Sequence, residues 1–138
     1  MIDTSNPIER SEDGAVQLFT DASGSLAERL QAAAPGSRVV KALNTITASV
    51  MVHPEQIEGD HLTFLAGDDA GAKADAAALL AQFGWAPAQI VDLGDLTAAR
   101  AAEAYLLLWS KLWGHVGHPR FNLTVAAAAD APSHPSPA

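Results

Sequence analysis

The sequence contains no cysteine. Disulfide bonds, a thiolate nucleophile and a cysteine-ligated zinc or iron–sulfur site are therefore excluded as the basis of its structure or chemistry. Basic residues are scarce too, because 8 lysines and arginines stand against 16 aspartates and glutamates, for a formal net charge of -8. A chain of this charge repels the phosphate backbone of a nucleic acid, so we expect no nucleic-acid partner.

Long apolar runs are missing as well. No stretch of about 18 consecutive apolar residues occurs, and residues 1–20 lack a basic start followed by an apolar run. We therefore expect a cytoplasmic protein with no membrane partner. The chain does have 138 residues, of which 49% are hydrophobic and 17% charged. This length and composition predict one packed domain.

Apolar periodicity and turn residues divide the chain into alternating strands and helices. The first residues predict the end of a strand that runs into a loop at Asn6-Pro7, and the polar residues 9–22 predict a surface loop. A capping box at Ser25 begins a helix that Pro35-Gly36 ends. We expect a buried strand at 38–43, further strands at 61–66 and 88–93, and a short helix opening near Ala48. A helix at about 70–83 is expected to be capped by Asp68 or Asp69, and a long helix to be capped by Thr97 and to reach about Gly114.

The long helix carries an apolar stripe with spacings of three and four residues, which predicts a buried face. Its members are Tyr105, Leu106, Trp109, Leu112, Trp113 and Val116. The tryptophans can belong to the core, to a subunit interface or to a platform on which a cofactor stacks. The core and interface interpretations are favoured. Arg100 and Glu103 are spaced to pair along this helix. Residues 121–125 predict a last strand, and the Ala/Pro/Ser-rich tail 126–138 is expected to be disordered.

Strands that alternate with helices at this spacing predict an α/β fold with a mostly parallel sheet. Ligands of such sheets bind at the carboxyl ends of the strands. If one pocket exists, the four loops that follow the strands are therefore expected to line it. These loops are Ser5-Asn6-Pro7, Asn44-Thr45-Ile46, Gly67-Asp68-Asp69 and Gly94-Asp95-Leu96.

A succession of short motifs over residues 1–125 resembles the NADP oxidoreductases that depend on coenzyme F-420, a deazaflavin. In order, the motifs are Ser5-Asn6-Pro7, Gly24-Ser25-Leu26-Ala27-Glu28, Pro35-Gly36-Ser37-Arg38-Val39-Val40-Lys41-Ala42-Leu43-Asn44-Thr45, Ala66-Gly67-Asp68-Asp69 with Lys73, Asp92-Leu93-Gly94-Asp95-Leu96 with Ala99-Arg100, and Glu103 with the Trp109 helix. The resemblance implies a Rossmann-like three-layer fold. Members of the family begin with a strand, a G-x-G-x-x-G loop and a helix that hold the pyrophosphate, and no segment here has that spacing. We expect residues 1–125 to be the C-terminal portion of such a domain, with the dinucleotide-binding half missing.

The resemblance also implies cofactors and site residues. NADP is expected to bind with its nicotinamide side near Asn6, Pro7, Asn44, Thr45 and Ala48, and coenzyme F-420 or another flavin-like acceptor to face it. Gly67, Asp68, Gly94 and Leu96 are the substrate-side candidates. Hydride transfer between two ring carbons needs no nucleophile from the protein, so no catalytic side chain is expected.

Several of these residues have a simpler interpretation. Asn6 is equally suited to cap its own turn, and Asp68 and Asp69 to cap a helix. His115 and His118 stand three residues apart, but Gly117 and Pro119 break any helix between them, so no metal site is expected.

Two functions remain open at this point. The first is an oxidoreductase that transfers hydride between NADPH and the deazaflavin. The alternative is a non-catalytic α/β module that pairs with a separate nucleotide-binding chain through its sheet edge. A homodimer or that complementary chain is the expected protein partner. The sequence decides neither NADP against NAD nor the identity of the acceptor, which is a deazaflavin, a flavin or a metal chelate.

Overall fold

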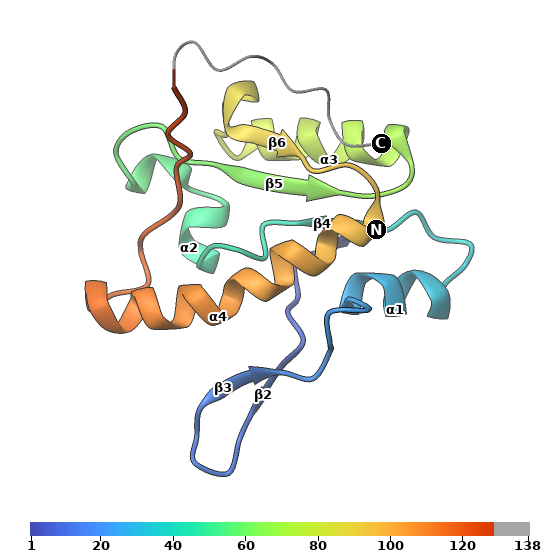
Figure 1. Cartoon of the computed structure of the whole chain (residues 1–138). Helices are drawn as coiled ribbons and strands as arrows, with labels where there is room; N and C mark the ends of the chain where they lie inside the picture. The colour runs from blue at the N-terminus through green and yellow to red at the C-terminus, as the bar shows by residue number, and fades with distance from the viewer. Residues whose placement is uncertain (129–138) are drawn as a thin grey trace.

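The computed structural model describes residues 1–128, which form a four-stranded sheet between helices and a separate two-stranded hairpin (Figure 1). The strands are β1 (Ile2–Asp3), β2 (Ile8–Arg10), β3 (Val16–Leu18), β4 (Val40–Ala42), β5 (Thr63–Ala66) and β6 (Ile90–Asp92). The helices are α1 (Leu26–Ala33), α2 (Ala48–Met51), α3 (Ala70–Gln82) and α4 (Ala99–Val116), with 3-10 turns at Pro54–Gln56, Pro87–Gln89 and Leu96–Ala98. Within residues 1–128, no helix combines the length and apolar character needed to cross a membrane.

The four-stranded sheet has the order β1-β4-β5-β6. Strands β1 and β4 are parallel, with Ile2 opposite Val40, and β5 and β6 are parallel, with Thr63 opposite Ile90. Between the two pairs, β4 and β5 are antiparallel. Two of the three pairings are therefore parallel, and the predicted α/β fold with a mostly parallel sheet is confirmed.

The antiparallel pairing separates the strand ends. Lys41 stands opposite Ala66, so the chain leaves β4 at one edge of the sheet and leaves β5 and β6 at the other. The prediction that all four loops line one pocket is therefore wrong. The segment between β4 and β5 holds only the four-residue helix α2 and a 3-10 turn. A parallel strand would need a crossover long enough to carry the chain back to the opposite edge.

Helices cover both faces of the sheet, which gives the three layers expected from the sequence (Figure 1). On one face, Val40 and Ala42 of β4 pack against Leu80 of α3 and the buried ring of Trp85. On the other, Val39 packs with Ala27 of α1 and Ala99 of α4. Val39, directly before β4, and Val40, its first residue, thus face opposite layers, as the alternation of side chains along extended backbone requires.

The segment predicted as a surface loop, residues 9–22, contains an antiparallel hairpin instead. Strands β2 and β3 pair with Ile8 opposite Leu18, and Gly14 in their turn has φ 83°. Asp13-Gly14 is a common hairpin turn, because glycine adopts positive φ without a steric cost. The hairpin extends away from the sheet, and β3 packs against α4 (Figure 1).

Two predictions at the ends of the last helix are wrong. Thr97 does not cap α4, because Asp95 accepts from the Thr97 amide at 2.9 Å and begins a 3-10 turn ahead of the helix. Residues 121–125 form no strand. They lie beside the residue that precedes β5, where the Leu62 amide donates to the Leu123 carbonyl at 2.9 Å. Residues 126–128 of the predicted tail form neither helix nor strand, and residues 129–138 lie outside the described residues.

The aromatic stripe of α4 is buried only at its beginning. Leu106 is buried, whereas Trp113 is 44% exposed and Val116 is also exposed. Trp109 stacks on Phe121 with ring centroids 5.5 Å apart, and its edge meets Trp113 at 5.2 Å. The two tryptophans and Phe121 thus form an aromatic cluster at the C-terminal end of the helix. Trp113 is the side chain of the cluster that is exposed to solvent.

Candidate functional site

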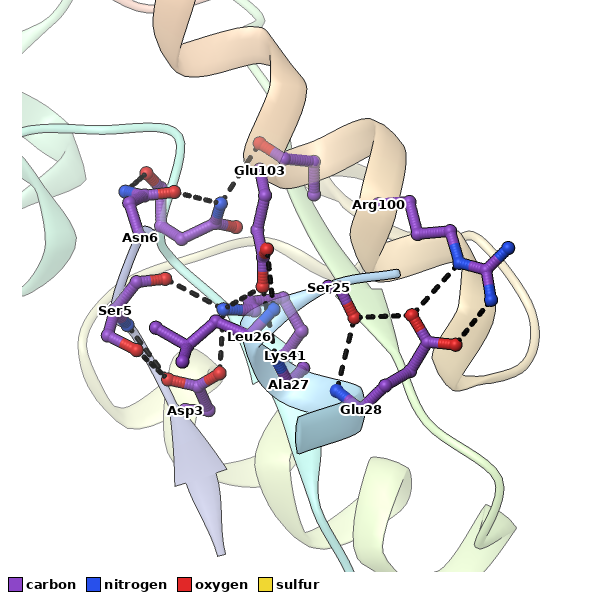
Figure 2. Close-up of polar contacts among 12 residues, drawn as sticks. Asp3, Ser5, Asn6, Ser25, Leu26, Ala27, Glu28, Lys41, Arg100 and Glu103 are labelled. Atoms are coloured by element: carbon purple, nitrogen blue, oxygen red, sulfur yellow. Dashed lines mark hydrogen bonds and ion pairs between the residues drawn. The ribbon is translucent and has the colours of Figure 1, made fainter. Parts of the chain in front are cut away.

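Two asparagine side chains join the carboxyl ends of β1 and β4. Nδ2 of Asn6 donates to the carbonyl of Asn44 at 2.8 Å, and Nδ2 of Asn44 donates to Oδ1 of Asn6 at 2.9 Å. Nδ2 of Asn44 also donates to the carbonyl of Ala102 on α4 at 3.0 Å. Figure 2 shows these bonds above the end of β1. The Asn6 side chain therefore bonds across the sheet instead of capping its own turn, and two of the sequence-predicted residues come together.

The residue before Asn44 has an uncommon backbone conformation. Leu43 has φ 62°, in the left-handed region that L-residues with a branched side chain rarely adopt. Its side chain is 5% exposed in the core, and its carbonyl accepts from the Ile46 amide at 3.3 Å. Burial of the side chain offsets the strain. Strained residues of this kind concentrate at binding and catalytic sites.

The other three predicted nicotinamide-side residues lie in different environments. Pro7 is fully buried, and its carbonyl accepts from the Phe19 amide of the hairpin at 2.8 Å. Thr45 is 4% exposed, and its hydroxyl has no hydrogen-bond partner. Ala48 begins helix α2 and is exposed. All three follow the carboxyl ends of β1 and β4, at the same edge of the sheet as the asparagine pair.

Beneath the asparagine pair lies a buried cluster of charged side chains, made of Asp3, Lys41 and Glu103 (Figure 2). The Lys41 ammonium lies 2.6 Å from Oδ2 of Asp3, 2.8 Å from Oε1 of Glu103 and 2.7 Å from the Ser5 carbonyl. The lysine and both carboxylates are between 1% and 3% exposed at the side chain. The ammonium thus donates to one carbonyl and is paired with two carboxylates, and a buried charge is tolerated when it is paired in this way.

Glu103 also caps helix α1 from helix α4. Its carboxylate accepts from the amides of Leu26 and Ala27, at 2.8 and 3.1 Å. The first amides of a helix have no partner within the helix, and a carboxylate is favoured there. The predicted pair of Arg100 with Glu103 is therefore wrong, since Glu103 faces the buried side of α4 and Arg100 lies on another face.

Arg100 instead holds Glu28 of α1. Its Nε and Nη2 donate to the two carboxylate oxygens of Glu28 at 2.9 and 2.6 Å. The hydroxyl of Ser25 donates to the same carboxylate at 2.7 Å, and the Glu28 amide donates to that hydroxyl at 3.1 Å. The hydrogen bonds from Arg100 lower the pKa of Glu28 to about 2, against the smaller opposing effect of burial. The predicted cap at Ser25 is confirmed.

The four substrate-side candidates lie together at the opposite edge of the sheet. The Gly67 amide donates to the Gly94 carbonyl at 3.1 Å, and the Leu96 amide donates to Oδ1 of Asp68 at 2.9 Å. Gly67 also lies against the start of β4, because a Cβ added to it would stand 3.0 Å from the Val39 carbonyl. These residues thus join the loop after β5 to the loop after β6. The length of the strands separates them from Asn6 and Asn44.

The acidic residues at this edge are held by structural contacts. Asp69 caps α3, accepting from the Ala72 amide at 2.7 Å, as the sequence predicted for Asp68 or Asp69. Lys73 pairs with Asp92 at 2.8 Å and donates to the Gly94 carbonyl at 3.0 Å. Burial tends to raise the pKa of Asp92, but the bonds from Lys73 and the Gly94 amide outweigh it, and the net shift is downward.

Sequence reasoning missed the buried cluster and the strain at Leu43. One signal for the cluster was present, because Lys41 stands between apolar residues in a strand expected to be buried. A lysine in that position needs a carboxylate partner. Which carboxylate the lysine pairs with depends on tertiary packing. The positive φ of Leu43 could not be predicted either, because no local sequence pattern indicates it.

The strand order, the three layers and the asparagine pair at the carboxyl ends of β1 and β4 define a Rossmann-like α/β protein. Comparison with known proteins indicates which members of this class the chain is similar to. Among solved structures, the chain is similar to a protein from Arthrobacter sp. FB24 described as a "putative F-420 dependent NADP-reductase". The two share 42% sequence identity over 91% of this chain, with a TM-score of 0.86. This similarity supports the resemblance to the deazaflavin-dependent NADP reductases.

The present chain spans 56% of the length of the Arthrobacter protein. It is also similar to a hypothetical protein from Sinorhizobium meliloti, with 32% identity and a TM-score of 0.52, covering 71% of this chain and 45% of that one. No protein-family model matches the chain, and no curated protein does.

Proposed function

We propose that this chain carries the nicotinamide-side part of an oxidoreductase that transfers hydride between NADPH and a deazaflavin of the coenzyme F-420 type. The observation that carries the proposal is the reciprocal bonding of Asn6 and Asn44 at the carboxyl ends of two adjacent parallel strands. Ligands of Rossmann-like sheets bind at such ends. The 42% identity to the Arthrobacter protein supports the same reaction class.

The residues present fit a nicotinamide-type ring. The asparagine amides are held by three hydrogen bonds, so their orientation is fixed before a ligand arrives. Strain at Leu43 and a buried, unpartnered hydroxyl at Thr45 lie in the same loop. The exposed Ala48 offers a surface without bulk, which a ring in van der Waals contact requires. The dinucleotide and the deazaflavin supply the redox chemistry, while this chain binds and orients the rings and excludes water.

These 138 residues contain no G-x-G-x-x-G loop, so they provide no loop of this type to bind the pyrophosphate of the dinucleotide. In Rossmann folds that loop and the helix it precedes hold the pyrophosphate, so their contribution to dinucleotide binding is absent here. The isolated chain is therefore expected to bind NADPH weakly. Reduced nicotinamide mononucleotide lacks the adenosine half, so it should bind this chain about as well as NADPH.

The test is a titration of the purified chain with NADPH and with reduced nicotinamide mononucleotide, following nicotinamide fluorescence and the melting temperature. Hydride transfer to oxidised coenzyme F-420 is measured in parallel as loss of deazaflavin absorbance. We expect saturable binding of both nucleotides and slow transfer, each weakened at least tenfold by Asn44→Ala. Gln17→Ala on the exposed hairpin removes an amide of similar size and is the control.

A second function is favoured by one observation. Strand β1 stands at the end of the strand order, and within residues 1–128 no strand pairs with its outer edge. That edge suits a parallel strand from a separate nucleotide-binding chain. A chain that melts cooperatively yet binds neither nucleotide at millimolar concentration would contradict the first proposal and favour this non-catalytic module.

A further inference from the structure

A buried histidine bonds to the C-terminal segment, defined as residues 121–125, where this segment passes the start of β5 (Figure 1). His61 is 4% exposed, and both of its ring nitrogens have a hydrogen-bond partner. Nε2 lies 3.1 Å from the Pro54 carbonyl, and Nδ1 lies 2.9 Å from Nδ2 of Asn122. The ring also meets the ring of Trp85 edge to face, with centroids 5.1 Å apart. The imidazole thus joins three parts of the chain.

The neighbouring bonds decide which ring nitrogen carries the proton. A carbonyl only accepts, so Nε2 of His61 donates to Pro54. Nδ2 of Asn122 donates to the Leu62 carbonyl at 2.8 Å, and Oδ1 of Asn122 accepts from the Leu123 amide at 2.8 Å. Turning this side-chain amide over would break both bonds. Nδ2 therefore faces the ring as a donor, and Nδ1 is the unprotonated acceptor.

A second proton on His61 has no acceptor in this arrangement. On the imidazolium, Nδ1 becomes a donor and points at Nδ2 of Asn122, which is also a donor. The other bonds of both side chains prevent either from turning away. Proton uptake therefore breaks the bond between the ring and the C-terminal segment. Accessible histidines take up this proton between about pH 8 and pH 5.

The charged groups around the ring do not compensate for a buried positive charge. Glu55, in the turn that contacts the ring, is 69% exposed at the side chain and pairs with His53 at 3.2 Å. Asp60 precedes the histidine and Arg120 precedes the C-terminal segment, and both are exposed. Residues 83–87, around the tryptophan, contain no titratable side chain. Among the described residues, no carboxylate bonds to the ring, and an unpaired buried charge is unfavourable.

The C-terminal segment depends strongly on this one anchor. Within residues 1–128, its hydrogen bonds to the rest of the chain come from Asn122 and from the Leu123 carbonyl, which accepts from the Leu62 amide. Phe121 adds a stacked contact with Trp109. Segments with few buried contacts open at a much lower free energy than the whole domain. Loss of the bond to the histidine is therefore sufficient to favour release of the segment.

We propose that His61 is a pH-sensitive switch: proton uptake by its imidazole releases the C-terminal segment from the start of β5. The neutral ring accepts from Asn122 and anchors the segment, whereas the imidazolium repels the same amide. The anchored state is fully stabilised at high pH, and this stabilisation is lost as the pH falls, because the released state binds one more proton. The proposal does not depend on hydride transfer, since it rests on the contacts of His61 alone.

The test is hydrogen exchange of the Leu62 amide, followed by NMR on the whole chain at pH 7.5 and pH 5.5. Protection is corrected for the intrinsic exchange rate at each pH and expressed relative to the amides of β4, which report opening of the sheet. An accessible histidine is roughly 90% protonated at pH 5.5, so we expect the relative protection of Leu62 to fall about tenfold. His61→Asn keeps an acceptor near Nδ1 and does not titrate, so its change should stay below about twofold. His53→Asn, at an exposed histidine, should retain the fall seen in the wild type.

A second measurement on the wild type needs no variant. Nitrogen chemical shifts of the His61 ring should place the proton on Nε2 at pH 7.5, and the midpoint of protonation should coincide with the fall in Leu62 protection. A constant relative protection of Leu62 at the two pH values, an equal fall in His61→Asn, or a proton on Nδ1 at pH 7.5 would overturn the proposal.

Discussion

Lys41 and Glu103 form an ion pair of 2.8 Å in which both side chains are only 1% exposed. The pair links β4 to α4, and through the amides of Leu26 and Ala27 it links both to the start of α1. The Ser5 carbonyl, next to Asn6, binds the same ammonium. The buried cluster therefore joins β4, α4 and α1 to one another beneath the candidate site.

Replacing the lysine should destabilise the chain strongly. Lys41→Met removes the ammonium and leaves the carboxylates of Asp3 and Glu103 buried without a cation. Breaking a buried pair in this way costs roughly 3–5 kcal/mol. Urea denaturation of the variant, compared with Lys111→Met at an exposed lysine, measures the difference. A loss below about 1 kcal/mol would show that the cluster is solvated in the folded protein.

The Glu28 carboxylate should make stability depend on acid pH. Its pKa is lowered from 4.5 to about 2 by the hydrogen bonds from Arg100. Because the folded pKa lies below the ordinary value, the stabilisation is complete above pH about 4.5 and is lost as the pH falls towards about 2. Glu28→Gln should therefore cost about 1 kcal/mol at pH 7 and much less near pH 2.

Free energies of unfolding of both proteins, measured by urea denaturation from pH 7 to pH 2, give this difference directly. Using the difference removes the effects of the other carboxylates. Glu58→Gln, at an exposed glutamate, should change the free energy of unfolding at pH 7 by less than about 0.5 kcal/mol. If the difference in the free energy of unfolding between wild type and Glu28→Gln stays constant with pH, the lowered pKa of Glu28 is contradicted.

Asn122 should anchor the C-terminal segment beside β5. Asn122→Ala removes the bonds to His61 and to the Leu62 carbonyl, at a cost of about 1–2 kcal/mol. The Leu62 amide, which donates to the Leu123 carbonyl, should then exchange its hydrogen faster. Hydrogen-exchange mass spectrometry measures the change, with Thr124→Ala at an exposed position as the control. Equal protection of Leu62 in both variants would rule out the anchor.

Gly67 should tolerate no side chain. A Cβ there would stand 3.0 Å from the Val39 carbonyl and 3.3 Å from Cγ2 of Val40. Because the closest atom belongs to the backbone directly before the central strand β4, we expect Gly67→Ala to cost about 1–3 kcal/mol. Gly24→Ala, where no atom lies within 4 Å of the added carbon, is the control. Thermal unfolding of the two variants compares them, and similar melting temperatures would contradict the close approach.

Local patterns predicted most elements, because capping and apolar periodicity depend on neighbouring residues. Ser25 caps α1 and Asp69 caps α3, and β4, β5 and β6 occur where apolar runs predicted strands, although the strand predicted at 121–125 is absent. The direction of β5 was not predictable in the same way. It depends on where the chain goes after α2, and no residue between β4 and β5 specifies that path.

For the site, the sequence identified Asn6 and Asn44 but not the reason they meet. Their bond depends on β1 and β4 being adjacent and parallel and on the turn at Leu43, which are tertiary features. The pairing of Glu103 was misassigned because spacing along a helix favours Arg100, whereas burial favours Lys41. Which carboxylate becomes buried is decided by packing across the sheet.

The contact between Glu103 and Leu26 joins residues 77 positions apart. A contact of such separation stabilises the fold only after the entropy cost of closing the loop has been met, so we expect it to form after the local contacts. Interactions that form after the transition state slow unfolding and leave the folding rate almost unchanged. We therefore expect the buried cluster to affect the lifetime of the native fold more than the speed at which the fold assembles.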